Sequence, residues 1–179
     1  MNLIARITDE DIGEVAVNTE SEKSKIRRGA RGIVVRDDGR IAVFNKANKN
    51  EYKLPGGGLE ENETPEEAFK REVLEETGCE VEIIDNLGIT EEYKSFNDFR
   101  QTSYVFVGKV LVDTKKLDVT EKEKNEGAKL IWEEPEEALA LITKCIEEIV
   151  PSEYSSVYST KFVVLRDRKI LEKYIELYK

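Results

Sequence analysis

Three glutamates stand close together in one short stretch of this chain, at a spacing that suits the binding of a cation. Glu72, Glu75 and Glu76 lie in the segment REVLEETG. On a helix that turns by about 100° per residue, Glu75 and Glu76 each lie within roughly 60° of Glu72, so the three acids share one side. No basic residue stands among them to neutralise them, and like charges at this spacing repel each other. A hard divalent cation such as Mg²⁺ prefers carboxylate oxygens and would turn this repulsion into ligation.

The residues around the acids predict the helix that must position them. Thr64 offers a hydroxyl N-cap, Pro65 suits the first helical position, and Glu66 and Glu67 stand at the positive end of the helix dipole. Gly78 is a suitable stop, because glycine readily adopts the left-handed conformation that ends helices. The sequence therefore predicts a helix between Thr64 and Gly78.

A glutamate-rich helix is in general more often a solvated surface than a site, and 37% of this chain is charged. Here, however, the acids belong to a longer pattern. Gly57, Glu63 and Arg71 precede them at fixed distances. Such a register of glycine, glutamate and arginine favours a functional site over a merely solvated face.

This pattern resembles the signature of the Nudix (MutT-type) hydrolase family: a glycine, five residues, a glutamate, seven residues, then Arg-Glu-aliphatic-any-Glu-Glu-any-Gly-aliphatic. Gly57, Glu63 and residues 71–78 match it, and Cys79 stands where an aliphatic residue is usual. A buried cysteine behaves as a small hydrophobe, so this departure affects nothing catalytic. The resemblance extends loosely from about residue 27 to residue 141. It implies the Nudix fold of the α/β (α+β) class, a mixed β-sheet sandwich flanked by helices.

The resemblance also implies roles for the residues of this signature, called the box below. Mg²⁺ or Mn²⁺ is the expected cofactor, and the expected ligands are Glu72, Glu75, Glu76 and the carbonyl of Gly56. Arg71 and Glu63 are expected to orient the helix and the loop before it. The implied catalytic residues are Glu63, Arg71, Glu75, Glu76 and one further glutamate outside the box.

That further glutamate is expected to be a metal ligand or a general base. Glu126, which precedes Gly127 and Trp132, resembles the family's site, and Glu123 is the alternative one helical turn earlier. An ordinary loop acid at either position stays an equal alternative.

The reaction that the resemblance implies is hydrolysis of a pyrophosphate bond in a nucleoside diphosphate linked to a further group X. A nucleoside triphosphate pyrophosphatase is one form of this activity. Two alternatives stay open: a catalytically silent Nudix domain that senses or binds a ligand, and an enzyme similar to isopentenyl-diphosphate isomerase. The isomerase reading requires a cysteine in the cleft, and neither Cys79 nor Cys145 stands where that cysteine is expected.

The sequence offers candidates for substrate contacts but no marker for the substrate. The proline or tyrosine about sixteen residues beyond the box, which marks certain subfamilies, is not cleanly present. Basic residues that could meet phosphates are Arg28, Arg31, Lys46 and Lys53, and aromatic residues that could stack on a base are Tyr93, Phe96, Phe99 and Tyr158. Each of them singly is more often a surface or core residue.

Composition restricts the partners. The 179 residues carry a formal net charge of −10, which argues against duplex nucleic acid because phosphate backbones require a basic face. Without histidine, catalysis must use carboxylates and metal-bound water, unless a lysine or tyrosine acts as the base. Two cysteines make no disulfide framework, and neither a signal peptide nor a membrane-spanning run is apparent. We expect a cytoplasmic protein with a small pyrophosphate substrate; a homodimer stays open.

The order of predicted elements indicates one domain, residues 1–179, with a core at about 27–142. An N-terminal extension, 1–26, is expected to form a hairpin from strands 3–8 and 14–17, and a C-terminal extension, 143–179, is expected to be helical. Alternation and β-rich composition predict strands at 30–36, 40–45, 81–90, 103–112 and 130–132, and residues 37–39 between the first two predict a hairpin turn. Beyond the box helix, helices are predicted at 138–149 and 169–178, with an irregular segment at 151–159.

Overall fold

The structure is a computed structural model that describes all residues from 1 to 179 and arranges them in eight strands, three 3₁₀ turns and four α-helices. The strands are β1 (Leu3–Ile7), β2 (Lys25–Val35), β3 (Ile41–Lys46), β4 (Glu51–Lys53), β5 (Gly56–Gly58), β6 (Cys79–Lys94), β7 (Phe99–Asp113) and β8 (Ala128–Glu133). The α-helices are α1 (Pro65–Thr77), α2 (Glu121–Asn125), α3 (Pro135–Cys145) and α4 (Val157–Tyr178). The 3₁₀ turns are η1 (Asp9–Ile12), η2 (Ala47–Lys49) and η3 (Ser95–Asn97).

The strands form one mixed sheet in the order β1-β6-β7-β2-β3-β4, while β5 pairs with β2 and β8 pairs with β3. Strand β2 is parallel to β7, and β1 is parallel to β6. The other pairs are antiparallel, among them the predicted hairpin of β2 and β3. This mixed sheet with flanking helices confirms the predicted fold class.

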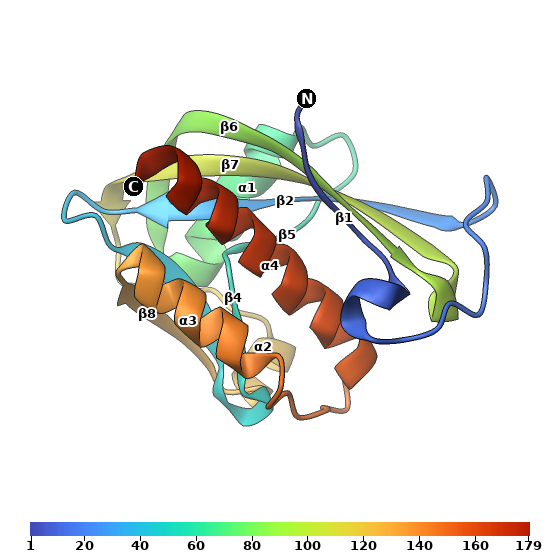
Figure 1. The fold of residues 1–179 in the computed structure, drawn as a ribbon. Helices are drawn as coiled ribbons and strands as arrows, with labels where there is room; N and C mark the ends of the chain where they lie inside the picture. Colours follow the sequence, from blue (N-terminus) through green and yellow to red (C-terminus); the bar gives the residue numbers. More distant parts are fainter.

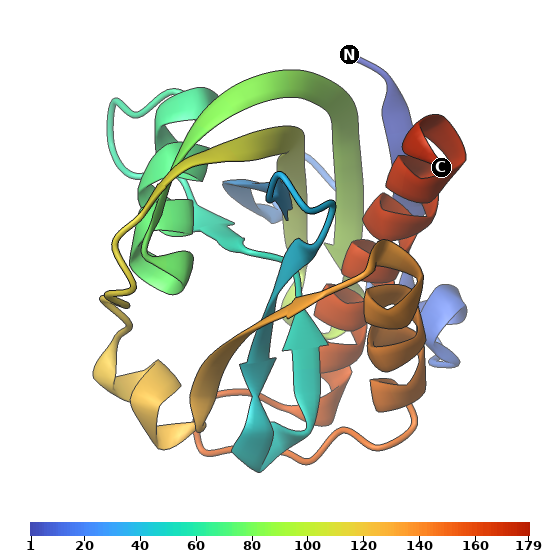
Figure 2. The ribbon, with the colours of Figure 1, turned by 90° about the vertical axis from the view of Figure 1, so that its left-hand side faces the viewer.

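Helices cover both faces of the sheet, α1 on one face and α3 with α4 on the other (Figures 1 and 2). Because side chains alternate along a strand, neighbouring residues of β2 enter different cores. Val34 packs in the cluster that contains Phe69 of α1. Ile33 packs in the cluster that contains Ile142 of α3 and Ile170 of α4.

The box helix begins and ends where the sequence predicts. Thr64 caps α1 by accepting a hydrogen bond from the Glu67 N–H, and Pro65 occupies the first turn. Gly78 ends the helix at φ 68°, a left-handed conformation that glycine adopts without strain. Both helix termini are thus fixed by local sequence.

The predicted N-terminal hairpin is wrong. Strand β1 pairs in parallel with β6, and residues 14–17 form no strand. After β1 the chain turns through η1, where the buried carboxylate of Asp9 accepts hydrogen bonds from Ser95 and from Tyr158 of α4. These long-range contacts join η1 to Ser95 and to α4, and no local sequence pattern predicts them.

The C-terminal predictions are right in type and wrong in their bounds. Helix α3 ends at Cys145 instead of residue 149, and α4 begins at Val157 with Ser156 as its cap, inside the segment predicted to be irregular. The early part of α4 contains Arg166 and Asp167, which look like solvent-facing residues but are almost fully buried. No helix in the structure combines the length and the apolar character needed to cross a membrane.

Candidate functional site

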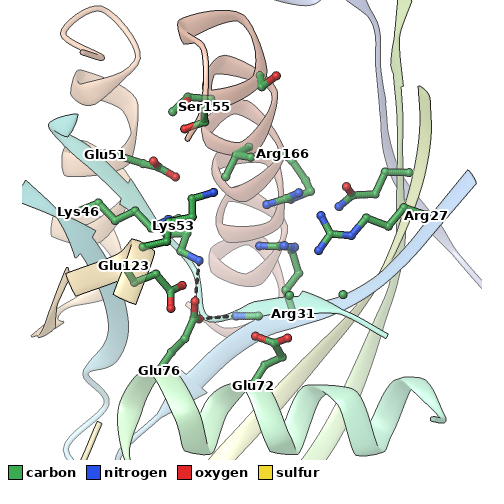
Figure 3. A pocket seen from close by; sticks show the side chains of 18 of the residues that line it. Arg27, Arg31, Lys46, Glu51, Lys53, Glu72, Glu76, Glu123, Ser155 and Arg166 are labelled. Atoms are coloured by element: carbon green, nitrogen blue, oxygen red, sulfur yellow. Dashed lines mark hydrogen bonds and ion pairs between the residues drawn. The ribbon is translucent and has the colours of Figure 1, made fainter. Parts of the chain in front are cut away.

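A cleft of about 750 Å³ opens between α1, the adjacent strands and α4. Figure 3 shows Glu72 and Glu76 pointing into it from α1, opposite a group of basic side chains. Its acidic lining residues are Glu51, Glu72, Glu75, Glu76 and Glu123. Its basic lining residues are Lys25, Arg27, Arg31, Lys46, Lys49, Lys53, Lys94, Lys122 and Arg166. The cleft is therefore positive in balance, although the whole chain carries −10.

Glu76 is the most buried glutamate of the box and has two donors of this chain beside it. Lys53 Nζ donates to Oε1 at 2.6 Å, and the Gly56 N–H donates to Oε2 at 2.8 Å. Burial raises the pKa of Glu76, although both donors oppose that shift. Burial lowers the pKa of Lys53, but the charge and hydrogen bond of Glu76 together with the charges of Glu51 and Glu123 leave the pKa raised, so Lys53 is a cation at neutral pH.

Arg71 joins the loop before α1 to the helix. Its guanidinium donates to both oxygens of Glu63, at 2.8 and 2.9 Å, and to the Gly58 carbonyl at 2.9 Å. It also reaches Glu72 at 2.9 Å and Glu75 at 3.4 Å. The hydrogen bond to Glu63 raises the pKa of Arg71 and lowers that of Glu63. This geometry suits the orienting role that the resemblance implies.

The expectation that no basic residue neutralises the three glutamates is wrong. Lys53 faces Glu76 and Arg71 faces Glu72 and Glu75. In this arrangement no three histidine, cysteine, aspartate or glutamate side chains converge as a metal-ion group. Lys53, on β4, is not visible from helical spacing, whereas the four-residue spacing of Arg71 and Glu75 does indicate their ion pair.

The expected ligand atoms, the carboxylates of the box glutamates and the carbonyl of Gly56, are nevertheless of the type that a hard divalent cation prefers. All of them are oxygens, which Mg²⁺ and Mn²⁺ prefer. The Glu72 carboxylate lies directly against Gly57, where a Cβ atom would come within 2.3 Å of Oε1. Only glycine leaves the carboxylate this place beside the loop. In this structure the Lys53 ammonium stands beside Glu76, one of the expected ligands.

The two glutamates outside the box differ in their surroundings. Glu123, in α2, lines the cleft near Glu76, as Figure 3 shows. Glu126 does not line it. Its side chain is 2% exposed and accepts hydrogen bonds from Lys46 Nζ and from the Ser152 hydroxyl, both at 2.7 Å. The structure thus brings Glu123, the second choice from the sequence, beside the box glutamates and holds Glu126 in a separate ion pair.

Of the basic residues considered for phosphate contacts, three line the cleft and one does not. Arg31, Lys46 and Lys53 are lining residues. Arg28 lies on the opposite side of β2 and borders a second, smaller cavity. The alternation of side chains along the strand separates it from its neighbour Arg27, which does line the cleft.

The aromatic candidates mostly lie outside the cleft. Tyr93 borders the smaller cavity and donates to Asp98. Phe96 stacks on Tyr158, with the ring centroids 4.3 Å apart, and neither ring lines the cleft. Of the four candidates only Phe99 is a lining residue.

Sequence reasoning missed six basic residues of the cleft: Lys25, Arg27, Lys49, Lys94, Lys122 and Arg166. Arg27 and Arg166 leave a signal in the sequence. Arg27 shares its strand face with Arg31 by period-two alternation. Arg166 stands four residues after Phe162 and four before Ile170, so a charged residue lies on the apolar face of a helix. Lys94 leaves no such signal.

Comparison with known proteins gives one family. The NUDIX domain profile matches residues 25–152. A MutT-like protein of Streptomyces ambofaciens is 48% identical over 58 residues, which are 32% of this chain and 38% of that protein. The diphosphoinositol polyphosphate phosphohydrolase 3-alpha of Mus musculus is 32% identical over 107 residues, 60% of this chain and 62% of that protein. The matches thus span less than two thirds of either relative's own length.

A solved structure has the same fold. The crystal structure of a MutT protein from Methanosarcina mazei Go1 superposes with a TM-score of 0.54 at 19% sequence identity, covering 89% of this chain and all of that one. At this identity the likeness concerns the fold alone. The profile match, in contrast, covers well over half of the chain and includes the entire box. The chain belongs to the NUDIX domain family.

Proposed function

We propose that this protein is a divalent-metal-dependent hydrolase that cleaves a pyrophosphate bond in a nucleoside diphosphate linked to X, or in a similarly phosphorylated small molecule. The observation that carries the proposal is the cleft itself, where the α1 glutamates face basic side chains across one cavity. An acidic protein that acts on phosphates needs a cation between its carboxylates and the substrate. The names of the two relatives, a MutT-like protein and a phosphohydrolase of a diphosphorylated compound, support the same reaction class.

Glu72, Glu75 and Glu76 would hold the metal ion, Mg²⁺ or Mn²⁺, with the Gly56 carbonyl as a further ligand and Glu123 as the glutamate outside the box. The bound ion would supply charge neutralisation on the phosphoryl oxygens. Lys53 has two uses in this account. It holds Glu76 in place without substrate, and on turning away it can place its ammonium on a substrate phosphate.

Glu123 is the better candidate for taking a proton from the attacking water. It lines the cleft, and although burial raises its pKa, the charge of Lys53, the hydrogen bonds from Thr120 and the charge of Lys46 together leave the pKa lowered, so Glu123 is ionised at neutral pH. Water then attacks one phosphorus atom, the bridging P–O bond breaks, and the second phosphate leaves with the electron pair. Glu126 keeps a part in holding Lys46, which borders the same cleft.

Neither alternative reading gains an observation in its favour. The isomerase reading needs a cysteine in the cleft, whereas Cys79 and Cys145 are buried and line none of it. The silent-domain reading predicts lost box glutamates, and this chain keeps all of them.

A phosphate-release screen tests the proposal. The substrates are nucleoside triphosphates, nucleotide sugars, ADP-ribose, dinucleoside polyphosphates and a diphosphoinositol polyphosphate, each with Mg²⁺ and with excess chelator. We expect at least one of them to be hydrolysed with Mg²⁺ only. Absence of hydrolysis across the set, with a folded protein and both Mg²⁺ and Mn²⁺ supplied, would overturn the proposal.

A further inference from the structure

The end of the cleft next to α4 holds an unusual concentration of positive charge. Arg27 and Arg31 reach it from β2, Lys94 from the end of β6, and Arg166 from α4; these four residues are called the basic subsite. Figure 3 shows the three arginines facing one another above the α1 glutamates. Helix α4 begins at Val157, beyond residues 25–152 that match the family profile. Arg166 thus lies outside the part of the chain that the family profile matches.

The carboxylates of the protein do not balance this charge. Only Glu92 and Asp167 pair with the basic subsite: Arg166 contacts both, Lys94 contacts Glu92, and Arg31 contacts Asp167. Four cations thus share two carboxylates. The Arg27 side chain makes no ion pair and no hydrogen bond in the structure, and its guanidinium lies against Gly58 of β5.

Three members of the basic subsite, Arg31, Lys94 and Arg166, are buried. Burial lowers the pKa of Lys94, and the positive charges of Arg166 and Arg27 lower it further, against the opposing charge of Glu92. A buried cluster of like charges is costly unless an opposite charge joins it.

Two donors of the basic subsite are also unsatisfied. Arg31 Nε and Arg166 Nη2 are buried and have no hydrogen-bond partner. Buried guanidinium groups usually have their N–H groups paired, and an unpaired one calls for an explanation. Both arginines border the cleft, so an anion that enters it can approach these groups.

The lysines at the other side of the cleft show the contrast. Lys46 pairs with Glu126 at 2.7 Å, and Lys49 and Lys53 pair with Glu51 and Glu76 at 2.6 Å. Each of these three cations has a carboxylate of its own. Among the buried cations of the cleft, spare positive charge is therefore concentrated at the basic subsite.

The residues that line the cleft also indicate what kind of chemical group binds there. Phe99 and Val163 are the two hydrophobic residues among the 25 that line the cleft. The Lys94 ammonium already lies 5.7 Å from the Phe99 ring centroid. Recognition at this end therefore depends on charge more than on apolar contact or stacking.

We propose that the basic subsite binds a second anionic group of the substrate, a phosphate ester or carboxylate that is separate from the pyrophosphate bond held at the α1 glutamates. The inference rests on the proposed function, because that function places the reacting phosphates at the glutamates. It narrows the substrate to small molecules with at least two separated anionic groups. A polyphosphorylated polyol and a nucleotide with an additional phosphate share this chemistry.

The test is calorimetric titration of the metal-free protein in excess chelator at low ionic strength. The probes are inositol hexakisphosphate, which has many phosphates and no base, adenosine 3′,5′-bisphosphate, which has two separated phosphates and a base, and AMP, which has one phosphate. We expect Arg27→Gln to weaken binding of the first two probes by about tenfold, which is the loss of one charge-assisted contact. Binding of AMP should change less. Comparison of the first two affinities distinguishes the polyol from the nucleotide source.

Arg28→Gln is the matched control. The two arginines are neighbours on β2, both are exposed, and Arg28 lies outside the cleft. Lys94→Gln is a second variant and should weaken binding as Arg27→Gln does. Equal affinities of Arg27→Gln, Arg28→Gln and the unmodified protein, or no binding of either multiply charged probe, would overturn the inference.

The result is separable from the test of hydrolysis, since no metal is present and no bond is broken. Arg27-dependent binding without hydrolysis of any substrate in the screen would reject the proposed function and keep the subsite. Hydrolysis that requires Mg²⁺ but does not depend on Arg27, with no binding of the probes, would reject the subsite and keep the proposed function.

Discussion

At the scale of single residues, Glu123 and Glu126 have opposite surroundings although one helical turn separates them. Glu123 faces the cleft and forms no buried ion pair. Glu126 is buried and paired with Lys46 and Ser152. Such a difference separates a residue that can act on water from one that holds its neighbours. Sequence spacing leaves both positions open, because it does not say which way each carboxylate points.

We predict that Glu123→Gln reduces kcat by about 10²–10⁴-fold, the usual cost of losing a general base, with little change in stability. Glu126→Gln should instead lower the free energy of unfolding by about 1–3 kcal/mol, because Lys46 stays buried without its carboxylate. Steady-state kinetics and urea unfolding of both variants check this. A loss of turnover confined to Glu126→Gln would reverse the two roles.

Glu76 and Glu75 also differ in what they contribute to the fold. The Glu76 side chain is 4% exposed and pairs with Lys53, whereas the Glu75 side chain is 40% exposed. We predict that Glu76→Gln lowers the free energy of unfolding by about 1–3 kcal/mol and that Glu75→Gln changes it by less than about 0.5 kcal/mol. Urea unfolding without metal measures both values. Unchanged or increased stability of Glu76→Gln would show that Lys53 does not neutralise this glutamate.

At the scale of elements, the loop from β5 to α1 depends on one arginine. Arg71 donates twice to Glu63 and once to the Gly58 carbonyl, so it links the loop, β5 and the helix. The sequence identifies this pair because both residues belong to the box. It does not identify the equivalent anchor of α4, where Asp167 accepts the Leu54 N–H at 2.9 Å, because these two residues are far apart in the chain and match no pattern.

The Arg71–Glu63 pair gives a prediction about pH. The Arg71 hydrogen bonds lower the pKa of Glu63 below its ordinary value of 4.5. As pH falls, Glu63 therefore takes up a proton at a higher pH in the unfolded chain than in the folded one. The stabilisation is therefore complete above about pH 5 and is lost as pH falls through the folded pKa. We expect Glu63→Gln to cost about 1–2 kcal/mol at pH 7 and progressively less below pH 4. Urea unfolding at several pH values measures this, and a cost that does not depend on pH would contradict it.

Element types were predictable where the pattern is local. The caps of α1 and the turn between β2 and β3 lie in a few adjacent residues, and both appear as predicted. The parallel pairing of β1 with β6 and the early start of α4 were not, since both depend on buried polar contacts between distant segments. Asp9 with Ser95 is one such contact, and Arg166 with Glu92 is another.

At the scale of the whole molecule, the net charge of the chain and the charge of the cleft lining have opposite signs. The net charge of −10 predicts that a cation accompanies a phosphate near the box, and this stays a prediction. Composition alone, however, conceals the nine basic side chains that line the cleft, because they come from β2, β3, β4, β6, α2 and α4 and the turn η2. Only the fold brings them together. The fold class and the box were thus predictable, whereas the charge of the cavity was not.

The most direct test of the central claim is the rate of phosphate release from the best substrate of the screen, measured with Mg²⁺, with excess chelator, and after Mg²⁺ is restored. Glu75→Gln is the informative variant, because its structural cost is small, and Glu80→Gln, an exposed acid just beyond α1, is its control. We expect turnover only with Mg²⁺, full recovery when Mg²⁺ returns, a loss of at least about 100-fold in Glu75→Gln, and no loss in Glu80→Gln. Turnover that persists in excess chelator, or that is unchanged in Glu75→Gln, would contradict it.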